Sequence, residues 1–582
     1  MNQDNRNLVL AIALSALLVI AYQIFFELPK QENIAEQQIQ NQENSQISDA
    51  FKGEKKSEIL LEESANYFSN SPRINIDTEK ISGSINLLGS KIDEVIFKDF
   101  RETIDPNSGN INFFNKLDTE RPYFAEIGWV FDKMTDDEKK GRILWKTNDD
   151  ILTENNSIKL IYESKNGLTI HRKINIDENY LFTFEDKLIN KNTFPIDVIQ
   201  YGRVKRSGTP KIDGLFILHE GLVGVIDENL REKKYSKLED IDPVPGETQK
   251  GELKYIPEKN GGWVGITDKY WLAATMPSQN DKVKYFGYQH SYNKLNKYQA
   301  HWFGKSININ PGESIETTAY VFAGAKKIDV LDKVENDINV YDFDKAINWG
   351  WFFFLTKPFF YALNWISNYV GNFGLAIIFL TIIIKLIFFP LANGSYRSMA
   401  KMKALQPKLT ELRERFKGDQ QALNKAMMEM YKTEKVNPAA GCLPIFIQIP
   451  VFFALYKVLY ISIEMRQAPF YGWIKDLSDK DPTSFINLFG LLPFSAQNLP
   501  IPEFIQLGIW PILMGFTMWL QMRLNPTSPD PIQARIFAWM PVAFTFLLAT
   551  FPSGLVIYWT WNNILSIGQQ WLITRQLSNS KK

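Results

Sequence analysis

GLAIIFLTIIIKLIFFPL, residues 374–391, is the stretch of sequence that decides the fold class. Its side chains are almost all aliphatic or aromatic, and it carries a single charged residue, Lys385. As an α-helix the stretch would be about 27 Å long, close to the roughly 30 Å thickness of the hydrocarbon core of a membrane. It therefore predicts a helix that crosses a lipid bilayer.

The segment that follows this stretch is basic. Residues 392–441 contain ten Lys or Arg side chains against five Asp or Glu, and loops with such an excess stay in the cytoplasm. Apolar residues recur at helical spacing from Met399 to Phe416 and again from Leu423 to Met430. We therefore expect a cytoplasmic helical hairpin over 392–441, so that the preceding span enters the membrane from the outer side.

Further apolar segments predict about six crossings in total. The predicted spans are residues 1–27, 374–391, 442–463, 504–522, 536–551 and 555–574, with an amphipathic interfacial helix at 346–370, an outer loop at 464–503, a cytoplasmic loop at 523–535 and a cytoplasmic tail at 575–582. An even number of crossings returns both termini to the cytoplasm. A cleavable signal peptide is the alternative for the first run, but the run is longer than the apolar core of about 7 to 15 residues that such peptides have.

A large polar region lies between the first and second spans. Residues 28–72 are rich in Gln, Asn, Glu and Ser without sustained periodicity, as is typical of a solvated tether. Residues 73–345 contain short β-branched and aromatic stretches, such as Leu168–Ile176, which turn signals separate. This pattern predicts an all-β sandwich. The single cysteine, Cys442, excludes an intramolecular disulfide.

No motif in the chain indicates catalysis. All four histidines lie in the β-rich region, and none has the spacing of a metal-ligand set. We therefore expect no enzyme activity, no catalytic residue, no cofactor and no metal. A tethered carbohydrate enzyme would need only one span, and an ATP-driven motor would need a G-x-x-x-x-G-K-[ST] loop, which the sequence lacks. A polytopic solute transporter remains as an alternative, although we see no repeat between the spans.

Lys385 is the residue of the predicted spans that most needs an explanation. A charge inside a span costs about 2.5 to 3.5 kcal/mol on insertion scales, so its ammonium should face a polar cavity or find a partner. The candidate polar neighbours are Thr381 on the same helix and Gln448, Tyr558 and Asn562 on other spans. Alternatively the side chain snorkels, because Leu391 is only about 9 Å further toward the predicted cytoplasmic end. The residues alone leave both interpretations open.

Motifs spread over about residues 345–575 resemble those of the YidC/Oxa1/Alb3 family of membrane-protein insertases. The motifs are SMAKM at 398–402, LQPK at 405–408, MYK at 430–432, EKVNP at 434–438, GCLP at 441–444, IQIP at 447–450, EMRQAP at 464–469, WIKDL at 473–477 and FPSGL at 551–555. The predicted anchor, tether and β-sandwich are similar in architecture to the Gram-negative, six-span form of the family. The fold class expected is thus an α-helical polytopic membrane protein with a large periplasmic β-sandwich and a cytoplasmic hairpin.

The resemblance implies a non-enzymatic insertase and chaperone of the bacterial inner membrane. Such a protein passes nascent membrane proteins into the lipid bilayer, alone or with the Sec translocon. The basic cytoplasmic loops are suited to ribosomal RNA and equally to anionic lipid, which share the same electrostatics, so the ribosome and the lipid bilayer are further expected partners and no DNA partner is expected.

The resemblance also places Lys385 in a hydrophilic groove. The family typically has arginine at this position, and lysine keeps the positive charge but loses the guanidinium fork. The polar neighbours named above would complete the groove. The candidates for substrate contact are Pro444, Ile449, Phe551 and Trp559.

Overall fold

The computed structural model describes most of the chain beyond residue 67. The described residues are 68, 70–139, 141–212, 218–226, 228–239, 249–293, 295–350, 352–416, 418–434, 436, 443–492, 494, 499–525 and 531–579. The predicted anchor at 1–27 and the predicted tether up to residue 67 lie outside them. In the described part, strands predominate up to Ala325 and helices follow from Ile328 onward.

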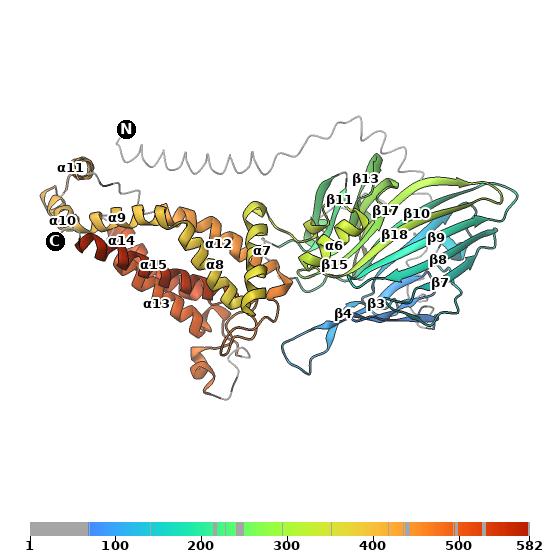
Figure 1. Cartoon of the computed structure of the whole chain (residues 1–582), viewed down its shortest axis with the longest axis horizontal. Helices are drawn as coiled ribbons and strands as arrows, with labels where there is room; N and C mark the ends of the chain where they lie inside the picture. Colours follow the sequence, from blue (N-terminus) through green and yellow to red (C-terminus); the bar gives the residue numbers. More distant parts are fainter. Residues whose placement is uncertain are drawn as a thin grey trace. The chain divides into compact units, whose positions relative to one another are not determined.

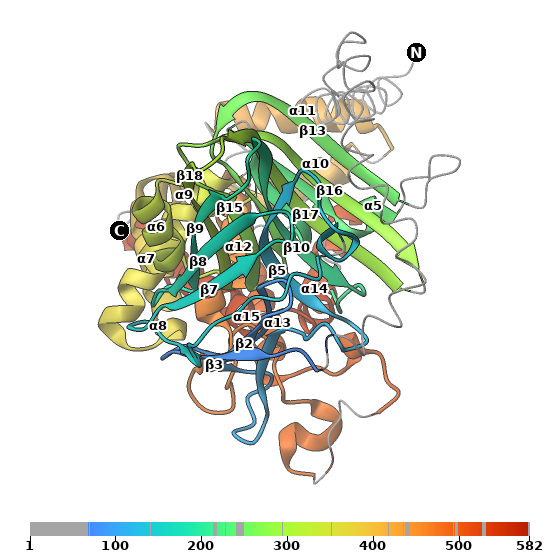
Figure 2. The same ribbon diagram turned by 90° about the vertical axis from the view of Figure 1, so that its right-hand side faces the viewer.

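Two sheets form the strand-rich region (Figures 1 and 2). The ten-stranded sheet has the order β13-β16-β17-β10-β5-β3-β2-β1-β6, with β4 paired to β3, and the eight-stranded sheet has the order β12-β11-β14-β15-β18-β9-β8-β7. The strands are β1 (Arg73–Asp77), β2 (Ile81–Asn86), β3 (Lys91–Arg101), β4 (Asn110–Phe114), β5 (Tyr123–Phe131), β6 (Ile151–Leu152), β7 (Ile158–Glu163), β8 (Leu168–Ile176), β9 (Leu181–Asn190), β10 (Ile196–Ser207), β11 (Gly221–Ile226), β12 (Asn229–Lys234), β13 (Gln249–Asn260), β14 (Trp263–Thr267), β15 (Trp271–Pro277), β16 (Lys282–Asn293), β17 (Leu295–Ile309) and β18 (Ser314–Ala325). The predicted β-sandwich is confirmed.

Alternating side chains give strand β9 one buried face. In β9 the side chains of Phe182, Phe184 and Leu188 are fully buried, whereas Glu185 and Lys187 between them are exposed. Successive side chains of a strand point to opposite faces, so this pattern packs one face of the sheet into the core. The same alternation places a carboxylate, Asp186, among the buried residues.

Asp186 is neutralised by Arg172 of the neighbouring strand β8. The guanidinium donates two hydrogen bonds to the carboxylate, at 2.8 and 2.7 Å, and a third to the carbonyl oxygen of Ile127 at 2.8 Å. The indole N–H of Trp129 donates to the same carboxylate at 2.7 Å. Both charged side chains have no exposed surface. Because every charge has a partner, the pair joins the two sheets without leaving a buried ion uncompensated.

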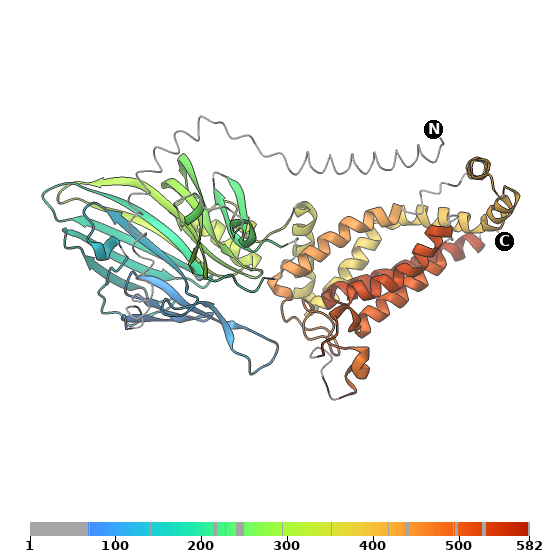
Figure 3. The same cartoon turned by 180° about the vertical axis from the view of Figure 1, so that it is seen from behind.

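Helices make up the remainder of the described chain. They are α6 (Ile328–Ile338), α7 (Phe353–Val370), α8 (Phe373–Ile387), α9 (Phe389–Ala404), α10 (Gln406–Arg415), α11 (Gln420–Thr433), α12 (Leu443–Ile461), α13 (Ile509–Leu524), α14 (Pro531–Leu548) and α15 (Ser553–Asn579), with short helices α4 (Asp136–Lys139), α5 (Tyr235–Glu239), η2 (Phe343–Ala346), η4 (Ile463–Met465), η5 (Phe485–Gly490) and η7 (Glu503–Ile505). Helix α15 contacts α8, α9, α12 and α13, and α13 also contacts α14. Figure 3 shows α13, α14 and α15 side by side. The cluster of apolar side chains between them includes Met514, Leu548 and Val556.

The helix at the quoted stretch is shorter than predicted. Helix α8 ends at Ile387 instead of Leu391, and the chain bends by 70° into α9. Pro390 explains the break, because proline has no amide hydrogen and its ring collides with the preceding turn. Among the described helices, none alone is both long and apolar enough to cross a bilayer, and α8 with α9 meets that criterion only as a bent pair.

Proline also divides the helix predicted from Met399 to Phe416. The structure has a break at Leu405, between α9 and α10, and Pro407 lies in the first turn of α10. The residue before a proline disfavours the helical conformation, so a helix tends to end there. Helix α11 follows, and the carboxylate of Asp419 caps its first turn by accepting from the amides of Gln421 and Ala422.

We expect the Asp186→Ala substitution to destabilise the β-sandwich by about 3 to 5 kcal/mol, because it leaves the Arg172 guanidinium buried without its counter-ion. The measurement is the denaturant midpoint of the purified full-length protein, followed by near-ultraviolet circular dichroism. Glu185→Ala is the matched control, because the neighbouring Lys173–Glu185 pair is 42% and 46% exposed. That substitution should cost less than about 1 kcal/mol. Equal effects of the two substitutions would contradict the assignment.

Candidate functional site

Lys385 lies in the last turn of α8, just before the bend into α9. Its ammonium donates a hydrogen bond of 2.8 Å to the hydroxyl of Ser566 in α15. The Ser566 hydroxyl in turn donates to the carbonyl oxygen of Asn562, one turn earlier, at 2.8 Å. The lysine therefore reaches across to the neighbouring helix for its polar contact. Among the described residues no carboxylate forms an ion pair with it.

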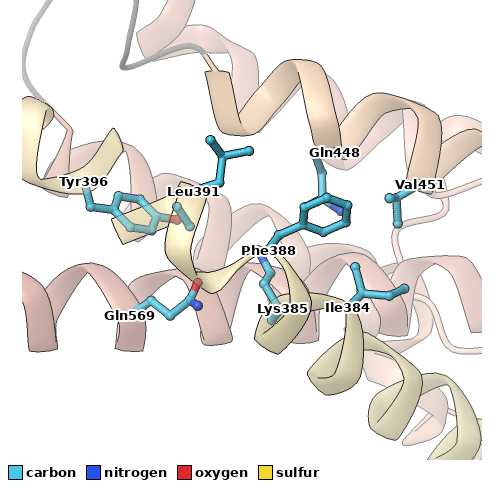
Figure 4. A pocket seen from close by; sticks show the side chains of 9 residues that line it. Ile384, Lys385, Phe388, Leu391, Tyr396, Gln448, Val451 and Gln569 are labelled. Carbon is cyan, nitrogen blue, oxygen red and sulfur yellow. The ribbon is translucent and has the colours of Figure 1, made fainter. Parts of the chain in front are cut away.

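A small cavity of about 40 Å³ adjoins the lysine. Figure 4 shows Lys385, Tyr396, Gln448 and Gln569 around it. The full lining is Ile384, Lys385, Phe388, Leu391, Ala392, Tyr396, Gln448, Val451 and Gln569, from helices α8, α9, α12 and α15. The volume is enough for a few water molecules. The bend after Ile387 makes this cavity possible, because it turns α9 away from the axis of α8.

Polar groups meet at the cavity from three sides. The side-chain amide of Gln448 donates to the hydroxyl of Tyr558, and the Tyr396 hydroxyl is hydrogen-bonded to Ser566. In the described part of the chain, the amide oxygens of Gln569 and Asn562 are buried and have no hydrogen-bond partner. Such unpaired acceptors are costly, so the site favours a polar occupant that can donate to them.

The structure brings together most of the predicted groove residues, but in different roles. Lys385 and Gln448 line the same cavity, and Tyr558 contacts Gln448. Asn562 takes part through its carbonyl oxygen, which accepts from Ser566. Thr381 is not among the lining residues: it is buried, and its hydroxyl donates at 2.7 Å to the Ile377 carbonyl of its own helix.

Sequence reasoning missed three residues of this site. Ser566 could have been found, because it follows Asn562 by one helical turn and so lies on the same face of the last span. Tyr396 falls within residues 392–441, whose polar and basic composition predicts a cytoplasmic hairpin. Gln569 carries no signal of its own in the sequence.

The four substrate-contact candidates do not form one surface with the cavity. Ile449 is an exposed residue of α12, next to Gln448. Phe551 and Trp559 are partly buried: Phe551 lies 5.5 Å from the ring of Tyr456, and Trp559 lies 4.7 Å from the ring of Phe452, measured between ring centroids. Pro444 lies in the first turn of α12. Of the three whose side chains the structure describes, Ile449 is the most exposed, at 44%.

Comparisons with known proteins add a second kind of information. Residues 73–362 match the family model of the YidC periplasmic domain, and residues 365–581 match that of the 60Kd inner membrane protein. The chain is 46% identical over 587 residues to the membrane protein insertase YidC of Rhizobium meliloti, covering 99% of this chain and 96% of the relative. It is 43% identical over 592 residues to that of Methylobacterium nodulans, with the same coverages. A crystal structure of an active YidC insertase matches with a TM-score of 0.35 and 16% identity, covering 88% of this chain and 98% of that one.

Proposed function

Because the chain belongs to the YidC family of membrane protein insertases, we propose that the cavity beside Lys385 receives the polar part of a membrane protein while that protein enters the bilayer. The substrate is then a nascent chain with a short hydrophilic tail and an apolar helix. No bond is made or broken in this process, so it needs no cofactor. The observation that carries the proposal is that, among the described residues, a single hydroxyl is the partner of the Lys385 ammonium.

A cation with so few partners is suited to attract an anionic or strongly polar group. Moving a carboxylate from water into hydrocarbon is very costly, and a fixed positive charge nearby offsets part of that cost. The unpaired amide oxygen of Gln569, which lines the cavity, can solvate donors of the passing chain. In this way the site lowers the barrier for the polar tail, and the exposed apolar face of α12 around Ile449 guides the substrate helix into lipid.

The proposed topology follows the charge distribution. Residues 392–441 hold ten basic and five acidic side chains, and residues 464–503 hold three basic and five acidic. The first segment then lies in the cytoplasm and the second in the periplasm. With the β-sandwich also in the periplasm, we propose six crossings, with α8, α12, α13, α14 and α15 as the last five and both termini in the cytoplasm.

The proposed partners are the Sec translocon and the ribosome. Exposed basic side chains on α9 and α10, among them Lys401, Lys403 and Arg415, support a contact with the phosphates of ribosomal RNA. Helix α10 is held to the end of α11 in part by the ion pair of Lys408 with Glu434, at 2.7 Å. A ribosome bound to these helices would deliver the nascent chain close to the cavity beside Lys385.

We expect Lys385→Ala to lower the insertion of a small membrane protein with an acidic translocated tail by about tenfold, which corresponds to about 1.4 kcal/mol of barrier. Lys385→Arg should retain most of the activity, because it keeps the charge. The measurement is protease protection of the tail in vesicles that contain the purified protein. A substrate with a neutral tail is the control and should respond less. Unchanged insertion of the acidic tail by Lys385→Ala would refute an essential role of the charge.

We also expect the cavity to be reached by water. In a Cys442→Ser background, Lys385→Cys should react with a hydrophilic maleimide in membrane vesicles, because the thiol must ionise to react and ionises only where water enters. Ile383→Cys on the same helix is the matched control, since Ile383 is exposed in the structure but does not line the cavity. If the exposed side of α8 at Ile383 faces lipid, the cysteine at this position should stay unlabelled. Equal labelling rates at the two positions would argue against a hydrated cavity.

A further inference from the structure

The loop between α12 and α13 carries a cluster of exposed apolar side chains. We define this apolar tip by six residues: Phe485, Leu488, Phe489, Leu491, Leu492 and Phe494. Leu491 is 84% exposed and is the most open of the six. No charged residue occurs between Asp481 and Glu503. In Figures 1 and 3 this orange loop stands out from the helices. Clusters of this kind on a protein surface mark an interaction site.

The backbone of the apolar tip holds its side chains outward. Leu488 and Phe489 both have positive φ angles, of 50° and 59°, inside the short helix η5. Bulky residues rarely adopt this left-handed conformation, because it crowds the Cβ atom against the carbonyl oxygen. Such strain persists where the surrounding structure enforces it and is typical of functional surfaces.

Hydrogen bonds within the apolar tip satisfy its polar backbone groups. The Phe489 amide donates to the Ser484 carbonyl at 2.7 Å, and the Leu492 amide donates to the Asn487 carbonyl at 3.1 Å. The buried Asn487 side chain accepts from the Gly490 amide and donates to the Phe494 carbonyl, both at 3.0 Å. Backbone groups that enter a medium without water need such internal partners.

Asp481 fixes the base of the loop to α13. Its buried carboxylate accepts from the Trp473 indole at 3.1 Å, from the Thr483 amide at 3.0 Å and from the Trp510 amide at 2.9 Å. Trp510 belongs to the first turn of α13, so the carboxylate also compensates the positive end of that helix. The apolar tip is therefore held in a fixed position beside the start of a proposed span.

We propose that the apolar tip inserts into the outer interface of the lipid bilayer and anchors the start of α13 there. The proposal rests on the topology proposed above, in which this loop is periplasmic and lies between two spans. A charge-free segment tied to the end of a span lies within reach of the lipid, and apolar rings and chains gain by leaving water there. Exposed Tyr471 and Trp473 in the same loop are the residue types that prefer the membrane interface.

The test uses the full-length protein in a Cys442→Ser background with one new cysteine, Leu491→Cys, labelled with an environment-sensitive fluorophore. The protein is reconstituted in vesicles of zwitterionic and anionic phospholipid that contain a lipid with a nitroxide near the headgroup. We expect the nitroxide to lower the emission at least twofold. Asn155→Cys, in an exposed turn between β6 and β7 of the β-sandwich, should lose little emission. Equal quenching at Leu491→Cys and Asn155→Cys would overturn the proposal.

A third labelled position distinguishes failure of the lipid-anchor proposal from failure of the proposed topology. Phe516→Cys lies on an exposed position of α13 and should be quenched by a nitroxide deep in the acyl chain if α13 spans the membrane. Quenching at Phe516→Cys without quenching at Leu491→Cys would reject the apolar tip as a lipid anchor and leave the topology intact. Absence of quenching at both positions would reject both.

Discussion

A lysine ammonium among apolar helices must be solvated by the protein itself, and the arrangement of the helical part follows from this constraint. Lys385 has one hydroxyl partner, Ser566, and that hydroxyl is in turn held by the last helix. The contact is possible because α8 ends at Ile387 and bends away, which leaves room for a small polar cavity. The bend, the cavity and the partner on α15 therefore belong to one feature.

The sequence predicts the parts of this fold that depend on local composition. The β-sandwich is confirmed, because alternating side chains such as those of β9 leave a signal that needs no tertiary information. Membership of the insertase family is also confirmed, since the motifs that indicated it are spread along the helical half. The end of α8 was predicted four residues late, because hydropathy follows composition and does not register the break that Pro390 imposes.

The candidate site was predictable only in part, for a different reason. Charge and polarity single out Lys385, Gln448 and Tyr558, because polar residues are rare in an apolar segment. Which polar groups meet is decided by helix packing, and that information is not local. Thr381 satisfies its hydroxyl within its own helix, whereas Ser566, which is distant in the sequence, supplies the contact with the lysine. Residues such as Ser566, which reach the site from another helix, are found only when the packing of the helices is known.

The described part of the chain buries several cations more completely than Lys385, among them Arg172, and the comparison clarifies what Lys385 does. Arg172 in the β-sandwich is paired with Asp186 and donates three hydrogen bonds, so its charge is fully compensated and serves stability. Among the described residues Lys385 has a single neutral partner, and Gln569 of the adjoining cavity has an unpaired amide oxygen. A site selected only for stability would carry a counter-ion or an apolar residue at this position, because an uncompensated charge is costly. The incomplete solvation of Lys385 is therefore the feature on which our proposal rests that this site attracts a polar segment of another chain and releases it again.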